Sequence, residues 1–205
     1  MERHREVPFW LCVGDVADAD GKYEDMPSLL YWIKGNNENF DTIASGELPA
    51  NIIYIPNALL TTVSSLRVAG LGGTHAPTMY ELPAADLPHP KKSSAKATDA
   101  ADRRRHFVRE EVEACKRMRD VDVFMSHEAP RPFRVNRGID AGKTPVNEVL
   151  ATMQPRLHLF GHHHRFVEAE VSGVPSICLD LVSKSYLLID GTTLKYQHLP
   201  SYPET

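Results

Sequence analysis

Short apolar runs that stop abruptly at polar side chains are the feature that most restricts how this chain can fold. In the clearest case, Leu157–Phe160 is followed by Gly161 and a run of three histidines. Such a run is typical of a buried β-strand, and the glycine permits a sharp turn where the strand ends. Alternate side chains then share a face, so His162 and His164 can converge while His163 points away. Because imidazole is a common ligand of zinc and iron, this strand end is a candidate metal site.

Three further apolar runs end in the same manner. The polar residues that follow them are Asp15 and Asp18, Asn36 and Glu38, and His127. Ligands of open α/β sheets bind at the carboxyl ends of strands, so these side chains are expected along one rim. Carboxylate, amide and imidazole groups together suit zinc, manganese or iron better than calcium. A solvated polar turn is the alternative for each segment.

Strand-like runs alternate with helix-like segments, and this alternation predicts an α/β fold. Strands are expected at residues 9–13, 52–55, 121–125, 157–160, 187–189 and 194–196, with 29–33 either a strand or the end of a helix. Residues 59–63 with 66–71, and 166–171 with 174–179, are expected as adjacent strands or hairpins. Helices are expected at 39–45, 101–119 and 144–153. The proline-rich segment 76–100 is expected to be a long loop, of the kind that often serves as a lid.

The bulk composition fits one globular domain spanning residues 1–205. Hydrophobic residues make up 42% and charged residues 24%, and the net charge of -4 gives no sign of an obligatory nucleic-acid partner. The three cysteines are widely spaced among apolar neighbours, as expected of buried thiols in a reducing compartment. No apolar stretch approaches the roughly 20 residues that span a bilayer. A cytoplasmic protein without a membrane partner is therefore expected.

Taken together, the polar strand ends resemble the motifs of the calcineurin-like metallophosphoesterase superfamily. That pattern runs Asp-x-His, Gly-Asp-x-x-Asp, Gly-Asn-His-Glu or -Asp, a lone His after a strand, and Gly-His-x-His. Four of the five parts have counterparts here, in order: Gly14-Asp15-Val16-Ala17-Asp18, Gly35-Asn36-Asn37-Glu38, Ser126-His127 and Gly161-His162-His163-His164. Residues 105–130 are also similar, more loosely, to RNA lariat-debranching members. The resemblance implies a layered two-sheet β-sandwich flanked by helices.

The resemblance also implies roles for these residues. Asp15 would bridge two divalent metal ions, Mn, Fe or Zn, and His164 would help to hold the first. The second would be held by Asn36, His127 and His162. Two such ions clamp a phosphoryl group and acidify a water that attacks phosphorus. Asp18 and Glu38 would orient the ligands by hydrogen bonding, with solvated turn carboxylates as the alternative.

Two departures from the family pattern affect the expected activity. Asn37 stands where the family has its catalytic histidine, and an amide cannot donate a titratable proton, so slower turnover is expected. The Asp-x-His block is absent, which leaves the first metal only Asp15 and His164. We expect either an N-terminally shortened chain that lacks the first strand or a member that has lost one metal. The edge beside residues 9–13 would then need a homo-oligomeric or other partner.

Some basic residues are weaker candidates for substrate binding. Arg131 and Arg134 follow His127 and could contact a phosphate, and His75 follows a strand end. The run Arg103–Arg105 is expected to be a solvated helical face, with phosphate contact as the less favoured alternative. The expected function is hydrolysis of a phosphomonoester or phosphodiester, in a phosphorylated small molecule, nucleotide or nucleic acid. The alternative is a degenerate scaffold that keeps the fold and binds a partner with little catalysis.

Overall fold

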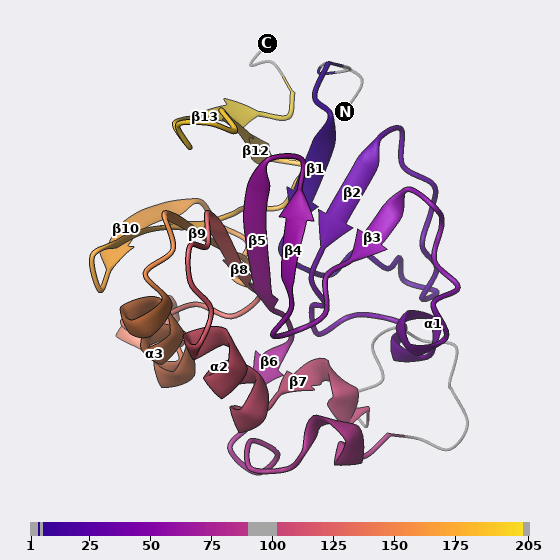
Figure 1. Ribbon diagram of the computed structural model, residues 1–205, viewed down its shortest axis with the longest axis vertical. Helices are drawn as coiled ribbons and strands as arrows, with labels where there is room; N and C mark the ends of the chain where they lie inside the picture. Colours follow the sequence, from indigo (N-terminus) through magenta and orange to yellow (C-terminus); the bar gives the residue numbers. More distant parts are fainter. Residues whose placement is uncertain (1–3, 5, 90–101, 203–205) are drawn as a thin grey trace.

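Three parallel strands near the N-terminus form a small sheet. The computed structural model describes residues 4, 6–89 and 102–202 (Figure 1). The sheet has the order β1-β2-β3, with β1 at Phe9–Cys12, β2 at Leu29–Trp32 and β3 at Ile52–Tyr54. The segment expected as either a strand or a helix end is thus a strand. β1 is an outer strand, and in the described part of the chain only β2 pairs with it.

A six-stranded mixed sheet lies at the centre of the fold. Its order is β10-β11-β9-β8-β5-β4. The bounds are β4 Leu60–Val63, β5 Leu66–Leu71, β8 Val123–Ser126, β9 Leu157–Phe160, β10 Val167–Val171 and β11 Val174–Cys178. β5, β8, β9 and β11 run parallel, and antiparallel β4 and β10 form the two edges. Both edge strands join their neighbours through the predicted hairpins.

Two short strand pairs complete the β-structure. β6 at Thr74–His75 pairs in parallel with β7 at His106–Phe107, and β12 at Ser185–Ile189 pairs antiparallel with β13 at Tyr196–Pro200. The last strand begins later than expected because Leu194 takes a left-handed backbone with φ of 59° in the preceding turn. Its side chain is nevertheless buried in the core.

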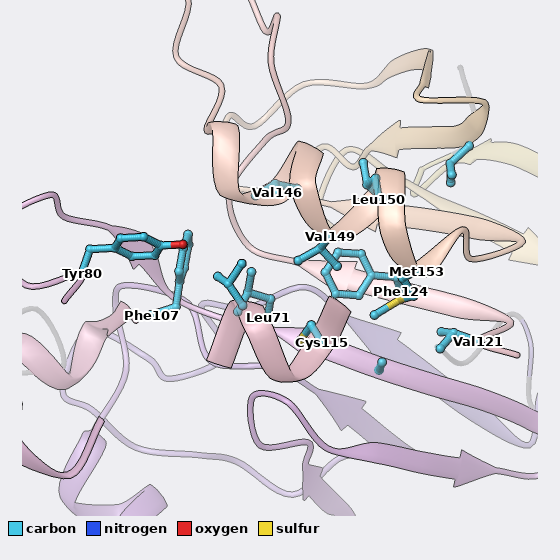
Figure 2. Close-up of a cluster of buried hydrophobic side chains, with 13 residues drawn as sticks. Leu71, Tyr80, Phe107, Cys115, Val121, Phe124, Val146, Val149, Leu150 and Met153 are labelled. Carbon is cyan, nitrogen blue, oxygen red and sulfur yellow. The ribbon is translucent and has the colours of Figure 1, made fainter. Parts of the chain in front are cut away.

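Two of the three α-helices in the described residues cover one face of the large sheet. They are α2 at Arg109–Lys116 and α3 at Thr144–Met153 (Figure 1). The short helix α1 at Phe40–Ser45 lies between β2 and β3 in the chain. In Figure 2, Val149 and Leu150 of α3 lie over Phe124 of β8, with Cys115 of α2 beside them. All four side chains are fully buried. This cluster joins the helical layer to the sheet.

The opposite face of the large sheet packs against the small sheet. Val13 and Ile33, which follow β1 and β2, share a buried cluster with Val68, Met125 and Leu159 of the large sheet. The β12–β13 hairpin contributes partly buried side chains to the same cluster. The layers are therefore helices, large sheet and small sheet, and the predicted α/β class is confirmed.

The helix expected over residues 101–119 is wrong in its first half. Arg103–Arg105 form a 3-10 turn, residues 106–107 form β7, and α2 begins only at Arg109. The extended residue Val108 starts the helix, and its N–H donates to the Glu111 side chain over 2.9 Å. The apolar spacing there reflects burial of a strand and a helix in succession. Residue 101 lies outside the described residues.

The described part of the expected loop at 76–100 contains regular structure and buried side chains. Residues 76–89 carry a 3-10 turn at Ala84–Asp86 and bury Tyr80 and Leu87. Tyr80 packs edge-on against Phe107, with ring centroids 6.4 Å apart. Residues 90–100 lie outside the described residues, so the expectation of a lid stays a prediction.

Candidate metal centre

The candidate ligands gather where parallel strands of both sheets end. Asp15 follows β1 and Asn36 follows β2, while His127 and His162 follow the adjacent strands β8 and β9. The loops after β8 and β9 are held together because the Gly161 N–H donates to the His127 carbonyl over 3.3 Å. The sheet register therefore fixes the separation of the two histidines.

Glycines allow the loops after β1 and β2 to approach each other. A Cβ atom on Gly35 would lie 2.1 Å from Asp15 Oδ1, and one on Gly14 would lie 2.6 Å from His127 Nδ1. Gly14 also has φ of +116°, which L side chains rarely adopt. Asp15 and His162 have left-handed φ values of 59° and 67°. Such conformations are uncommon outside glycine and are often found at functional sites.

His127 lies at the centre of the site and is oriented by the backbone. Its Nδ1 is 2.8 Å from the Val13 carbonyl oxygen, which can only accept, so Nδ1 carries the proton. In the neutral ring Nε2 then presents a lone pair. That atom lies 3.0 Å from Asn36 Oδ1, 3.1 Å from His162 Nδ1 and 3.8 Å from Asp15 Oδ2. Four potential ligand atoms therefore converge from four strand ends.

Both histidines of this cluster are neutral near pH 7. Burial lowers the pKa of His127, and burial lowers that of His162 to about 4, with the His127 ring as the next cause. A neutral His162 can donate from Nδ1 to His127, or leave Nδ1 free for a metal. In this structure the Asn36 side chain turns its oxygen, and not its NH2 group, toward the His127 lone pair, so two acceptors face each other. A cation between these atoms would satisfy both.

The separations fit a shared ion. Nitrogen and oxygen ligands lie about 2.0–2.2 Å from ions such as zinc, which places neighbouring ligands roughly 3.0–3.5 Å apart. The contacts of His127 Nε2 at 3.0 Å and 3.1 Å fall in that range, and the 3.8 Å contact with Asp15 lies beyond it. Histidine, cysteine, aspartate and glutamate alone form no group of three or more suited to a metal within the described residues. The candidate set adds the Asn36 amide oxygen to Asp15, His127 and His162.

Asn37 holds the Asp15 carboxylate. Its backbone N–H donates to Asp15 Oδ1 over 2.8 Å, and its side-chain amide donates to Oδ2 over 3.3 Å. The contact of Asn37 in this structure is thus with a candidate metal ligand. Its expected contact with a phosphate or leaving group stays a prediction.

Glu38 is a buried carboxylate that fixes the loops on either side of the site. It accepts from the backbone N–H groups of Asp15 at 2.7 Å, Val16 at 3.2 Å and Gly35 at 3.0 Å. The Tyr23 hydroxyl donates to it over 3.0 Å. Burial raises the pKa of Glu38 to about 7, while the backbone donors act in the opposite direction. These contacts hold the backbone of the loop that carries Asp15, and a role of Glu38 in orienting metal ligands stays a prediction.

Asp18 does not take the orienting role expected of it. It is exposed, and its carboxylate accepts from the N–H groups of Asp20 and Lys22, both at 2.8 Å. It makes no hydrogen bond to Asp15 within the described residues. Sequence spacing could not distinguish this local turn from a contact across the site, because both satisfy a short polar side chain after a strand.

The three histidines after β9 point in different ways. His162 lies in the cluster, whereas His163 stacks on Phe133 with ring centroids 4.6 Å apart. His164 is exposed, and no hydrogen bond or ring contact joins it to Asp15 among the described residues. A role for His164 in a first metal site stays a prediction.

The basic residues predicted to bind substrate have partners outside the cluster. Arg131 donates to Asp140 over 2.8 Å, and Arg134 donates to the Gly138 carbonyl over 3.2 Å. His75 packs on Tyr80, with ring centroids 4.9 Å apart. No hydrogen bond joins any of these three side chains to Asp15, Asn36, His127 or His162 in the described part of the chain.

Two cations lie near the site: Lys143, which no sequence pattern singles out, and Arg105, for which phosphate contact is the less favoured sequence-based alternative. Lys143 pairs with the buried Glu128 over 3.4 Å, and after burial its charge is the next cause that lowers the pKa of His75. Arg105 was expected on a solvated helical face, but it lies in a turn packed on the site loops. A basic residue in a loop carries no sequence signal that would locate it beside a strand end far away in the chain.

Comparisons with known proteins support the fold only. No protein-family model matches the chain, and no curated protein matches it. A solved crystal structure is similar, with a TM-score of 0.58 at 12% sequence identity. The alignment covers 85% of this chain and 66% of that chain. In the described residues, no helix has the length and apolar character needed to cross a membrane.

Proposed function

We propose that the chain is a divalent-metal-dependent phosphoesterase that hydrolyses a phosphomonoester or phosphodiester. One observation carries this proposal. His127 Nε2, Asn36 Oδ1, His162 Nδ1 and an Asp15 carboxylate oxygen converge at the ends of strands from two sheets, 3.0–3.8 Å from His127 Nε2. A cluster of acceptor atoms with too few protons is best satisfied by a metal cation.

The residues have defined tasks in this proposal. Asp15, Asn36, His127 and His162 would hold the metal, which supplies Lewis acidity toward a phosphoryl oxygen and an acidified water. The Val13 carbonyl keeps the His127 proton on Nδ1, so that Nε2 is always the ligand. Asn37 and Glu38 fix the Asp15 carboxylate and its loop before any metal arrives. The protein therefore contributes a preformed geometry.

The fold and the motif order agree with this function. We infer that the layered sheets form a metallophosphatase-like sandwich, since the four family motifs follow β1, β2, β8 and β9 in turn. The substrate would be a phosphorylated small molecule, a nucleotide or a nucleic-acid phosphodiester. The looser likeness to lariat-debranching members is compatible with a phosphodiester.

Metal content and turnover test the proposal together. The purified chain is loaded with Mn²⁺, freed of excess ion, and assayed for bound metal and for hydrolysis of bis(4-nitrophenyl) phosphate. We expect bound Mn²⁺ and turnover, both lost in Asp15→Asn. Asp86→Asn is the matched control, because Asp86 is exposed in a separate 3-10 turn. A chain without bound metal or turnover would contradict the proposal and favour the binding scaffold.

A further inference from the structure

The turn Arg103–Arg105 is anchored against the loops of the candidate metal centre. Lys34, which directly precedes the Gly35–Asn36 loop, is buried and donates from Nζ to the Arg104 carbonyl over 2.8 Å. It also donates to the His106 carbonyl over 3.1 Å. A Cβ atom on Gly73, after β5, would lie 2.4 Å from the Arg105 carbonyl oxygen. The backbone of the turn is therefore fixed beside the ends of β2 and β5.

The three arginines of this turn have different surroundings. Arg103 is exposed. Arg104 is saturated, since its guanidinium donates to Asp102 over 2.5 Å and to Asp41 over 2.6 Å. Arg105 is half-buried, and in the described part of the chain it has neither a hydrogen bond nor an ion pair. Arg105 therefore has a guanidinium that is not committed to a carboxylate of the chain, unlike that of Arg104, and it can bind an external anion.

The turn that carries Arg105 lies next to the loop that supplies Asn36 to the candidate metal centre. Lys34, which binds the Arg104 carbonyl, lies two residues before the candidate ligand Asn36. The His127 ring is only 2% exposed and faces the other candidate ligands. An anion bound by Arg105 would therefore lie close to a metal ion held by the candidate ligands.

We propose that Arg105 binds a phosphate oxygen of the substrate beside the metal centre. The choice of phosphate as the anion rests on the proposed phosphoesterase function. The planar guanidinium presents paired N–H donors that match phosphate oxygens, and it stays charged at any physiological pH. Arg105 is accordingly a binding residue that neutralises substrate charge and transfers no proton.

Binding of inorganic phosphate tests this assignment directly. Phosphate is titrated by calorimetry into the chain as purified, and again after loading with Mn²⁺ and removal of free ion. We expect Arg105→Ala to weaken phosphate binding by about 10- to 100-fold, the range for loss of a charge-assisted contact. Arg105→Lys keeps the charge without the paired donors and should fall between the wild type and Arg105→Ala.

Arg103→Ala is the matched control, because it removes the same charge from an exposed position of the same turn. We expect its phosphate affinity to stay within about twofold of the wild type. The proposal is overturned if the wild-type chain binds no phosphate in either form, or if Arg105→Ala binds it as tightly as the wild type.

Hydrolysis of bis(4-nitrophenyl) phosphate in the same samples separates the two proposals. Phosphate binding that depends on Arg105, in a metal-loaded chain without turnover, would contradict the phosphoesterase and keep the anion site. Turnover with an unchanged KM in Arg105→Ala would overturn the role of Arg105 and keep the phosphoesterase. In the expected case Arg105→Ala raises KM and retains bound Mn²⁺, since Arg105 contacts none of the ligands.

Discussion

At the scale of single residues, the site is defined by acceptor atoms that face each other without a proton between them. The Val13 carbonyl fixes the His127 proton on Nδ1, and burial keeps the ring neutral, so Nε2 can only accept. Asn36 presents an oxygen to the same atom. The proposed cation rests on these two acceptor atoms that face each other.

Asp15→Asn should abolish or greatly weaken metal binding. The carboxylate supplies the negative charge of the cluster, and the loss should exceed the roughly 10- to 100-fold effect of removing an outer partner of a ligand. His163→Ala should change metal affinity little, because that ring stacks on Phe133. Calorimetric Mn²⁺ titration measures both variants. Equal losses in the two variants would contradict the assignment of His162 over His163.

Glu38→Gln should destabilise the fold by about 1–3 kcal/mol, the range for a buried donor left unpaired. The glutamine keeps one oxygen for the N–H groups of Asp15 and Gly35, but its NH2 group faces the Ala17 N–H and the Tyr23 hydroxyl, which both donate to the other oxygen of Glu38. Urea unfolding monitored by circular dichroism measures the change in the free energy of unfolding. Glu47→Gln is the control, since Glu47 is exposed, and it should lie within about 0.5 kcal/mol of the wild type. A wild-type midpoint for Glu38→Gln would show that these hydrogen bonds contribute nothing.

At the scale of elements, the sequence predicts the strands that carry the ligands better than the segments between them. A run such as Leu157–Phe160 has one stable solution, a buried strand, and its end fixes the position of His162. The segment 101–119 has apolar spacing that both a helix and a strand-helix succession satisfy. Pairing of β7 with β6, from a distant part of the chain, decides between them. Arg105 could not be placed for the same reason.

Gly35→Ala tests whether the close approach of the loops after β1 and β2 forms the site. The new methyl group would lie 2.1 Å from Asp15 Oδ1 and displace the carboxylate. We expect at least a roughly tenfold loss of Mn²⁺ affinity, comparable with the loss of an orienting partner. Gly191→Ala is the control, because a Cβ atom there meets nothing within 4 Å. If the two variants bind Mn²⁺ equally well, Asp15 is not a ligand.

At the scale of the whole molecule, burial of neutral histidines should make the fold sensitive to acid. In the described residues, burial lowers the pKa of six histidines: His75, His106, His127, His158, His162 and His163. The pKa is about 4 for His106 and about 3 for His158. In the unfolded chain each of these histidines binds a proton near pH 6.5, whereas in the folded chain it stays neutral until the pH is lower.

The free energy of unfolding of the metal-free chain should therefore fall as the pH drops from about 6.5 toward 4. Glu38 and Glu128 oppose this trend, because burial raises the pKa of each carboxyl. The two carboxyl groups oppose the effect of six histidines, so the histidines determine the expected trend. Urea unfolding at a series of pH values measures the slope. Stability that stays constant or rises between pH 6.5 and 5 would contradict the neutral state of the buried histidines.

The most direct test of the central claim is the position of a metal ion in the protein. Crystals of the Mn²⁺-loaded chain, measured for anomalous scattering, should show a peak about 2.0–2.3 Å from His127 Nε2 and Asn36 Oδ1. The same peak should contact His162 Nδ1 and a carboxylate oxygen of Asp15. A strong peak elsewhere, or none at these four atoms under saturating Mn²⁺, would contradict the account.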